Sequence, residues 1–134
     1  MLERLREKKV KATPQRLAVL EYLRSGYIHP SAEEIYKKLK PLCPSLSLAT
    51  VYNTLEALVD AGAVNRLTID ARRTNYEYGR APHAHFLCRV CGEIYDMPIR
   101  RAGAAVLRGH KIEKTWQYHQ GVCRKCLKSP QKKI

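Results

Sequence analysis

The chain has 134 residues, with 25 lysines and arginines against 12 acidic residues and a formal net charge of +13. That length suits one modest domain or two very small ones. No apolar run reaches the roughly 18 residues of a membrane-spanning helix, so we expect a soluble protein without a membrane partner. The charge favours a polyanionic partner such as nucleic acid, although a generally basic, solvated surface would give the same total.

The first part of the chain carries the apolar spacing of helices. Leu2 and Leu5 lie on one face of a short charged helix. Thr13 followed by Pro14 predicts an N-cap and the first residue of a second helix. That helix ends at Ser25-Gly26, and its apolar stripe consists of Leu17, Leu20 and Leu23.

Two further helices follow. Ser31 with Glu34 three residues later forms a capping box, and Pro41 ends the helix that it starts. The buried face of this helix consists of Ile35, Tyr36 and Leu39. Ser47 caps the next helix, and Gly62 stands where a helix C′ glycine belongs. The inward residues of that helix are Val51, Leu55, Leu58 and Val59.

Two extended runs, 64–69 and 74–78, come next and are joined by a turn at residues 70–73. Three helices followed by a hairpin predict a winged helix-turn-helix, in which the third helix enters the DNA major groove and the hairpin leans on the backbone. Short or hydrogen-bonding side chains on the outward face of that helix suit base edges and thymine methyl groups: Ala49, Thr50, Tyr52 and Asn53. A polar surface helix without this role fits the segment alone equally well.

The connector at residues 79–82 contains glycine and proline and marks a boundary between a DNA-binding domain at 1–80 and a second domain at 81–134. Strands at 86–88 and 93–96, a helix at 98–108 and a strand at 111–119 predict a small α/β lobe, which makes the fold class α+β. Residues 1–80 hold 14 basic and 9 acidic side chains, and residues 81–134 hold 11 and 3. The second lobe is the more basic, so either it also faces nucleic acid or the charge does not locate the DNA-binding surface.

Two Cys-x-x-Cys pairs are the strongest chemical signal in the chain. Cys88 and Cys91 are separated from Cys123 and Cys126 by 31 residues. Such paired knuckles are typical of a tetrahedral zinc site with Zn–S distances of about 2.3 Å. Four thiolates would leave no open position for water or substrate, so the pattern predicts a structural zinc ion rather than a catalytic one.

Other uses of the four cysteines stay open at this point. Disulfides need an oxidising compartment, whereas Met1-Leu2-Glu3-Arg4 leads directly into a charged segment without the pattern of a signal peptide, so we expect a cytoplasmic protein. A redox Cys-x-x-Cys usually follows a strand of a βαβ unit, and that context is missing. An iron–sulfur cluster could use the same four ligands. Cys43, between Leu42 and Pro44, is expected to be a small, partly buried residue.

A second group of metal-ligating residues precedes and follows the first knuckle. His83 and His85 point to the same side of an extended segment, so both imidazoles can reach one metal ion, and Asp96 follows on the returning strand. Glu77 at the end of the hairpin and His29 in a loop are further candidates, although spacing alone does not select them. Mixed nitrogen and oxygen ligands suit Fe²⁺, Mn²⁺, Zn²⁺, Co²⁺ or Ni²⁺.

The chain closely resembles the ferric uptake regulator (Fur) superfamily over almost its whole length. The elements that carry the resemblance are Thr13-Pro14-Gln15-Arg16, His29-Pro30-Ser31-Ala32-Glu33-Glu34-Ile35-Tyr36, Ser47-Leu48-Ala49-Thr50-Val51-Tyr52, Ala61-Gly62, His83-Ala84-His85-Phe86-Leu87-Cys88, Cys91-Gly92 and Gly121-Val122-Cys123. The resemblance implies a homodimeric, metal-responsive repressor that binds a palindromic operator, with the four cysteines as structural zinc ligands. It also implies a regulatory site of His29, Glu77, His83, His85 and Asp96, in a second domain that serves dimerisation and metal sensing.

Several positions bear on the subfamily. Peroxide-sensing members typically carry aspartate where this chain has Glu77, so the glutamate resembles iron-sensing members and favours iron-responsive control of metal homeostasis. A peroxide-sensing member with Fe²⁺ or Mn²⁺, in which His29 or His83 would be oxidised, is the alternative, as is a zinc-responsive member. Zinc sensors often add a cysteine near the hinge, and none lies between Glu77 and His83. Ala84 and Thr115 stand where many iron sensors carry an additional metal site, which we expect to be absent.

The resemblance implies an allosteric mechanism in which metal selects an arrangement that sets two recognition helices roughly 34–36 Å apart. Thr50 and Tyr52 are then the expected base contacts, and Lys11, Arg16 and Arg72 the expected backbone or minor-groove contacts. His110 and His119 are expected to be surface or strand residues.

Two rivals from other classes remain. A zinc hydrolase would need an open coordination position and a general base, and no His-Glu-x-x-His motif is present, so we expect neither an enzyme nor a small-molecule substrate. A zinc-stabilised DNA-binding protein that does not switch would bind DNA equally with and without metal at the histidines.

Overall fold

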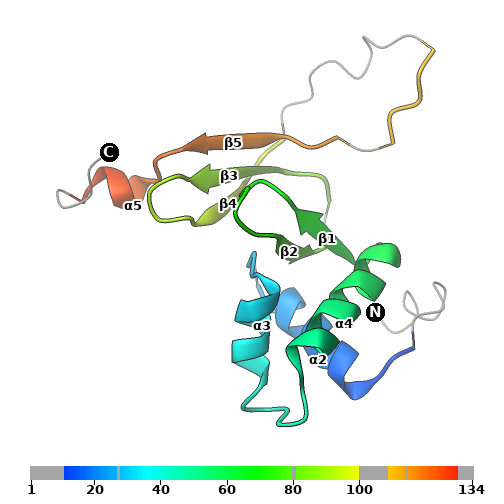
Figure 1. Ribbon diagram of the computed structural model, residues 1–134. Helices are drawn as coiled ribbons and strands as arrows, with labels where there is room; N and C mark the ends of the chain where they lie inside the picture. The colour runs from blue at the N-terminus through cyan, green and yellow to red at the C-terminus, as the bar shows by residue number, and fades with distance from the viewer. Residues whose placement is uncertain (1–10, 27, 80, 100–108, 114, 130–134) are drawn as a thin grey trace. The chain divides into compact units, whose positions relative to one another are not determined.

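The computed structural model describes residues 11–26, 28–79, 81–99, 109–113 and 115–129 (Figure 1). The chain divides into two compact units between Gly79 and residue 80. The charged helix at Leu2 and Leu5 lies outside the described residues, as do residues 100–108 of the helix expected at 98–108 and the end of the basic tail. Pro98 and Ile99 are described and are not helical.

The first unit begins with three helices, α2 (Pro14–Arg24), α3 (Ala32–Leu39) and α4 (Leu48–Asp60). Each starts at its predicted N-cap, where a hydroxyl oxygen accepts a hydrogen bond from the backbone N–H three residues later. Thr13 accepts from Arg16, Ser31 from Glu34, and Ser47 from Thr50. The helices end where glycine or proline follows, at Ser25-Gly26 and before Pro41.

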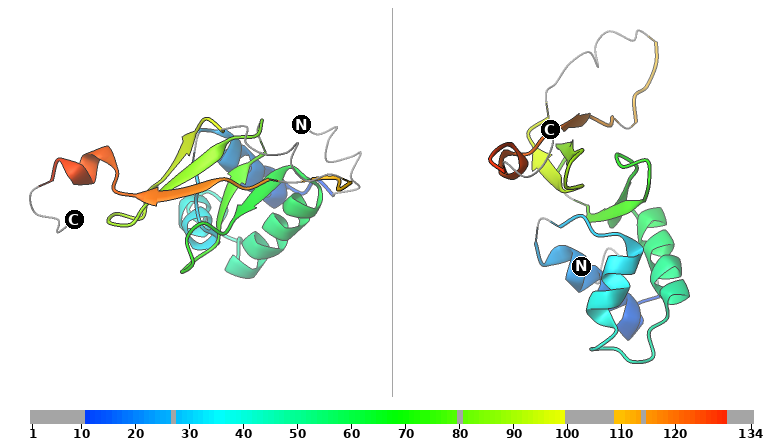
Figure 2. Two further views of the ribbon diagram at one scale, coloured as in Figure 1. Left: turned by 90° about the horizontal axis from the view of Figure 1, so that it is seen from above. Right: turned by 60° about the vertical axis from the view of Figure 1, so that its left-hand side comes forward.

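The three helices enclose one apolar core, and Figure 2 shows them grouped together in blue, cyan and green. Its fully buried members include the predicted inward residues Leu20, Leu23, Ile35, Val51, Leu55 and Leu58. Leu17, Tyr36 and Val59, which were expected inside, are only partly buried and pack against the edge of this core. The core fixes the angle at which the outward face of α4 is presented, because α4 packs on both α2 and α3.

A β-hairpin completes the first unit. Strand β1 (Val64–Leu67) pairs antiparallel with β2 (Asn75–Tyr78), and Gly62 adopts the positive φ of 73° expected of a C′ glycine after α4. Both strands are shorter than the predicted runs. The turn between them is held by Asp70, whose carboxylate accepts a hydrogen bond from the backbone N–H of Arg72 at 3.0 Å. Three helices followed by this hairpin form the predicted winged helix-turn-helix.

The second unit is built on a three-stranded sheet, with β3 (Ala84–Cys88) between β4 (Ile94–Met97) and β5 (Tyr118–Gly121). The pairing of β3 is antiparallel with β4 and parallel with β5 (Figure 1). A short helix, α5 (Arg124–Leu127), follows β5. With the first unit this gives the α+β fold that the sequence predicted.

The predicted strand at 111–119 was wrong over most of its length. Among the described residues, only Tyr118 and His119 of that run belong to β5, which continues to Gly121. Pairing with β3 begins at the hydrogen bond from the His85 N–H to the Gln117 carbonyl and ends opposite Cys88. Residues before Gln117 lie beyond the N-terminal end of β3. They alternate in polarity, but in this ladder they have no strand to pair with.

Candidate metal centres and DNA-binding surface

The four cysteines of the two knuckles come together at one end of the second unit. Cys88 is the last residue of β3, and Cys91 lies in the turn after it. Cys123 is the N-cap of α5, and Cys126 lies within that helix. The pairing of β3 with β5 places Cys88 opposite Gly121, which brings the knuckles side by side. All four sulfur atoms lie within 4.8 Å of one another.

The spacing of these sulfurs fits a tetrahedral metal ion. Cys91 Sγ and Cys123 Sγ are 3.8 Å apart, and ligands about 2.3 Å from a tetrahedral zinc ion are separated by about 3.8 Å. A disulfide requires about 2.05 Å between sulfurs, and none of the five cysteines, all of which lie among the described residues, forms a disulfide. The donor set is therefore compatible with structural zinc and does not have the geometry of two disulfides.

The electrostatics of the cluster also favour a bound cation. Burial raises the pKa of the Cys88 thiol, but backbone hydrogen bonds from Cys123, Cys91 and Val90 outweigh it and lower that pKa to about 6. Burial and the neighbouring sulfurs raise the pKa of Cys126 to about 12. Four thiols this close cannot all ionise without a compensating positive charge, which a divalent ion bound by thiolates supplies.

A second ligand set lies at the other end of the same sheet. His85 on β3 stands directly opposite Asp96 on β4, and His83 precedes β3. His83 Nε2 and His85 Nε2 lie 3.3 and 3.5 Å from the same oxygen, Asp96 Oδ1. The Ala81 carbonyl, 2.8 Å from His83 Nδ1, leaves Nε2 directed at the carboxylate. The expectation that both imidazoles point to one side of an extended segment agrees with this geometry.

The first unit contains a separate pair of candidate ligands, His29 and Glu77. His29 Nε2 lies 3.5 Å from Glu77 Oε2, and both side chains are buried. The loop that carries His29 is fastened to β2 by two hydrogen bonds of 2.8 Å, from Asn75 Nδ2 to the His29 carbonyl and from the Tyr76 N–H to the Pro30 carbonyl. Asn65 on β1 donates to the other oxygen, Glu77 Oε1, at 3.2 Å.

The two groups differ in the number of candidate ligands that they hold. The second unit holds two imidazoles and a carboxylate close together, and the first holds one of each. Mn²⁺ and Fe²⁺ favour five or six ligands of mixed nitrogen and oxygen type, which neither set supplies alone. The contacts of Asn65 with Glu77 and of Asn75 with the His29 loop were not predicted from the sequence. The only feature of the sequence that could have indicated them is a polar amide on a strand near a candidate ligand.

The outward face of α4 carries the residues predicted to contact DNA. Ala49, Tyr52 and Asn53 are exposed, and Thr50 is half-buried with its hydroxyl 2.8 Å from that of Ser47. The Tyr52 hydroxyl donates to the Glu33 carboxylate of α3, a contact that spacing along the chain did not suggest. Exposed Lys11 is linked to Arg16, whose Nη1 donates to the Lys11 carbonyl at 3.1 Å. The surface is polar and accessible, as readout of base edges requires.

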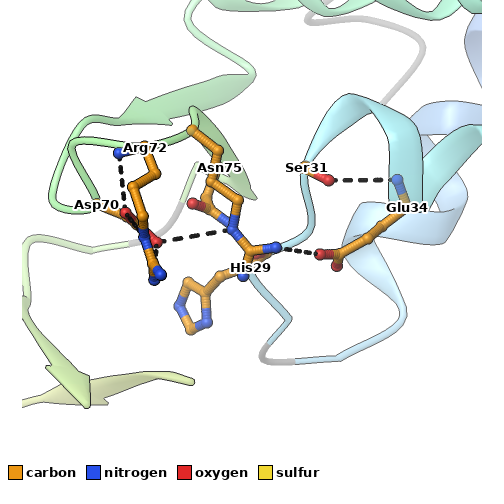
Figure 3. A network of polar contacts seen from close by, with 7 residues as sticks. His29, Ser31, Glu34, Asp70, Arg72 and Asn75 are labelled. Atoms are coloured by element: carbon orange, nitrogen blue, oxygen red, sulfur yellow. Dashed lines mark hydrogen bonds and ion pairs between the residues drawn. The ribbon is translucent and has the colours of Figure 1, made fainter. Parts of the chain in front are cut away.

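A carboxylate organises the turn of the wing hairpin (Figure 3). Asp70 has only 3% of its side chain exposed and accepts hydrogen bonds from the guanidinium of Arg72 at 3.1 and 3.2 Å. The Arg72 guanidinium and backbone N–H lower the pKa of the Asp70 carboxyl. Arg73 Nη1 donates to Glu34 Oε1 at 3.0 Å and so ties the turn to α3. Arg72 remains 75% exposed, but Asp70 already holds its guanidinium, and a phosphate would have to share it.

The chain matches a known protein family over most of its length. The sequence profile of the ferric uptake regulator family matches residues 7–120. The chain belongs to that family. This match confirms the resemblance to Fur proteins. It also confirms the prediction that the chain is a transcriptional repressor that binds DNA and metal. Among the described residues, no helix combines the length and apolar character needed to cross a membrane.

Proteins with different functions are similar to this chain. The peroxide operon regulator of Bacillus subtilis (strain 168) is 37% identical over 132 residues, which cover 95% of this chain and 91% of that protein. The ferric uptake regulator of Pseudomonas aeruginosa with manganese superposes with a TM-score of 0.75 at 27% identity, over 91% and 96% of the two chains. The peroxide-sensing regulator PerR of Streptococcus pyogenes has a TM-score of 0.55 at 37% identity, over 93% and 89%.

Proposed function

We propose that this Fur-family repressor is cytoplasmic, acts as a homodimer on a palindromic operator, and binds that DNA when a divalent metal ion occupies a regulatory site. Its ligands would be His29, Glu77, His83, His85 and Asp96. Its structural zinc would be held by Cys88, Cys91, Cys123 and Cys126. The observation that carries the proposal is the convergence of two imidazole nitrogens on one oxygen of Asp96, at 3.3 and 3.5 Å.

The chemistry of the ligands supports a responsive regulatory site rather than a permanent one. Imidazole and carboxylate groups bind Mn²⁺ and Fe²⁺ less tightly than four thiolates bind zinc, so this site can exchange its metal while the zinc stays bound. A bound divalent ion would attract the proposed ligands of residues 1–79 and those of residues 80–134 alike. The protein's own contribution is to keep the two partial ligand sets ordered, through the β3–β4 pairing and the contacts of the 28–31 loop with β2.

DNA recognition is assigned to the first domain. Thr50, Tyr52, Asn53 and Ala49 on α4 are proposed to face the major groove, with Lys11, Arg16 and Arg72 near the DNA backbone. The second domain would join two copies, so that two α4 helices reach half-sites one helical turn apart. Metal can then select the arrangement in which both α4 helices reach their half-sites. For this, it must bind that arrangement more tightly than the alternative by a few kcal/mol.

The experiment that tests this function measures DNA binding as a function of metal. Palindromic duplexes are selected from a random library with zinc-loaded protein in Mn²⁺, and binding is then measured with Mn²⁺, with Fe²⁺ under anaerobic conditions, and with a chelator that leaves the zinc in place. We expect Mn²⁺ or Fe²⁺ to tighten binding by about 5- to 150-fold, the range of typical allosteric couplings. Equal affinity in all three conditions would leave a zinc-stabilised DNA-binding protein that does not switch.

Peroxide sensing is the second candidate, and it is favoured by the similarity to the B. subtilis peroxide operon regulator. The same assay distinguishes it when hydrogen peroxide is added to the Fe²⁺-loaded protein. A peroxide sensor loses DNA binding irreversibly and gains 16 Da on His29 or His83, whereas the Mn²⁺ form does not. An iron-responsive repressor that lacks this chemistry keeps its DNA affinity after Fe²⁺ is replenished.

A further inference from the structure

Glu77 is held from two sides within the first unit. It lies on β2 directly opposite Asn65 on β1, and only 4% of its surface is exposed. Its two carboxylate oxygens have different neighbours, since Oε1 accepts from Asn65 Nδ2 at 3.2 Å and Oε2 lies 3.5 Å from His29 Nε2. The amide therefore occupies one oxygen and leaves the other on the side of the histidine.

The His29 side of this arrangement is fixed independently of Glu77. Asn75 shares a face of β2 with Glu77, two residues away, and donates Nδ2 to the His29 carbonyl at 2.8 Å (Figure 3). In the portion of the chain that the structure describes, Asn75 Oδ1 is buried without a hydrogen-bond partner, which costs stability. An apolar residue would avoid that cost. The presence of an amide at this position is therefore best explained by its hydrogen bond to the His29 loop.

We propose that Asn65 is a positioning residue for the regulatory metal site: its amide restricts Glu77 to binding metal through the single oxygen Oε2. This inference rests on the proposed function, because it takes Glu77 to be a ligand. A carboxylate free of Asn65 could rotate and offer both oxygens, which changes the number of ligands and their distance from His29. Residues that orient a ligand in this way commonly change metal affinity by about 10- to 100-fold when they are removed.

A plain structural role for Asn65 is the alternative. Cross-strand side-chain pairs stabilise hairpins, and their loss would lower the stability of the wing whether or not metal is present. Asn65 is exposed while Glu77 is buried. Surface substitutions seldom change stability much, so Asn65→Ala is expected to fold normally and to expose any effect on metal binding separately.

The test measures Mn²⁺ binding to the full-length, zinc-loaded protein by the electron paramagnetic resonance signal of free Mn²⁺, together with thermal unfolding without Mn²⁺. Asn65→Ala should weaken Mn²⁺ binding by about 10- to 100-fold at an unchanged metal-free melting temperature. Asn65→Gln, which keeps the amide, should recover part of the loss. Thr68→Ala, at an exposed position just beyond β1, is the matched control and should bind Mn²⁺ like the original protein.

Glu77→Ala separates failure of this inference from failure of the proposed function. If Glu77→Ala loses Mn²⁺ binding while Asn65→Ala keeps full affinity, Glu77 is a ligand but Asn65 does not position it, and the inference is overturned. If Glu77→Ala itself keeps full affinity, both the ligand assignment and the role of Asn65 fail. A lower metal-free melting temperature in Asn65→Ala with unchanged Mn²⁺ affinity would assign Asn65 to the hairpin alone.

Discussion

Replacing Cys123 by serine is expected to abolish zinc binding and unfold the second unit. Structural zinc sites with thiolate ligands contribute about 10–16 kcal/mol of apparent binding free energy at neutral pH. A whole small domain is stable by only about 5–15 kcal/mol. The buried residues of the apolar cluster around this site are Cys88, Cys123 and Cys126 themselves, so little else there can replace the metal. Zinc content by mass spectrometry and the amide NMR signals of β3, β4 and β5 report the two effects.

Cys43→Ser is the matched control for this substitution. Cys43 is the one cysteine outside the cluster, and it lies half-buried in the first unit. The same chemical change there should leave one zinc ion per chain and an intact second unit. Retention of stoichiometric zinc and a native spectrum by Cys123→Ser would contradict the assignment of the four thiols as the structural site.

Replacing His83 by alanine is expected to remove the response of DNA binding to metal while leaving zinc in place. His83 supplies one of the two imidazole nitrogens that converge on Asp96 Oδ1. Loss of that ligand should weaken Mn²⁺ binding by more than the roughly 10- to 100-fold that follows loss of a residue that only orients a ligand. The Mn²⁺-dependent gain in DNA affinity, expected to be about 5- to 150-fold, should then disappear at Mn²⁺ concentrations that saturate the original protein.

His119→Ala provides the comparison for His83→Ala. His119 is an exposed histidine on β5 of the same sheet, paired in register with Phe86. Its removal changes the same residue type without touching Asp96 Oδ1. Both variants should bind DNA alike in chelator, and only His119→Ala should respond to Mn²⁺. A normal Mn²⁺ response in His83→Ala would exclude this histidine from the regulatory site.

Features set by neighbours along the chain were predictable from the sequence. The caps at Thr13, Ser31 and Ser47 depend on a hydroxyl and an N–H three residues away, so the pattern alone locates them. Each Cys-x-x-Cys motif places two thiols close enough to bind one metal ion, so the motif alone indicates the ligands. The His83 and His85 pair follows equally from the two-residue repeat of an extended strand.

Features that depend on distant contacts were not predictable in the same way. His29 and Glu77 meet only because Asn75 and Tyr76 fasten a loop to β2, so resemblance to a family was needed to select them. The ion pair of Arg73 with Glu34, 39 residues away, forms only when the hairpin turn and α3 are both folded. The start of β5 is set by the length of β3, which the alternating polarity of residues 111–119 does not reveal.

Reciprocal linkage is the most direct measurement of the central claim that metal and operator DNA act on one equilibrium. The affinity of the zinc-loaded protein for Mn²⁺ is measured with and without the selected palindromic duplex, and the affinity for the duplex is measured with and without Mn²⁺. Thermodynamics requires the two ratios to be equal if metal controls DNA binding, and we predict the same factor of about 5 to 150 from both. A Mn²⁺ affinity that does not change when the duplex binds would contradict a metal-controlled repressor.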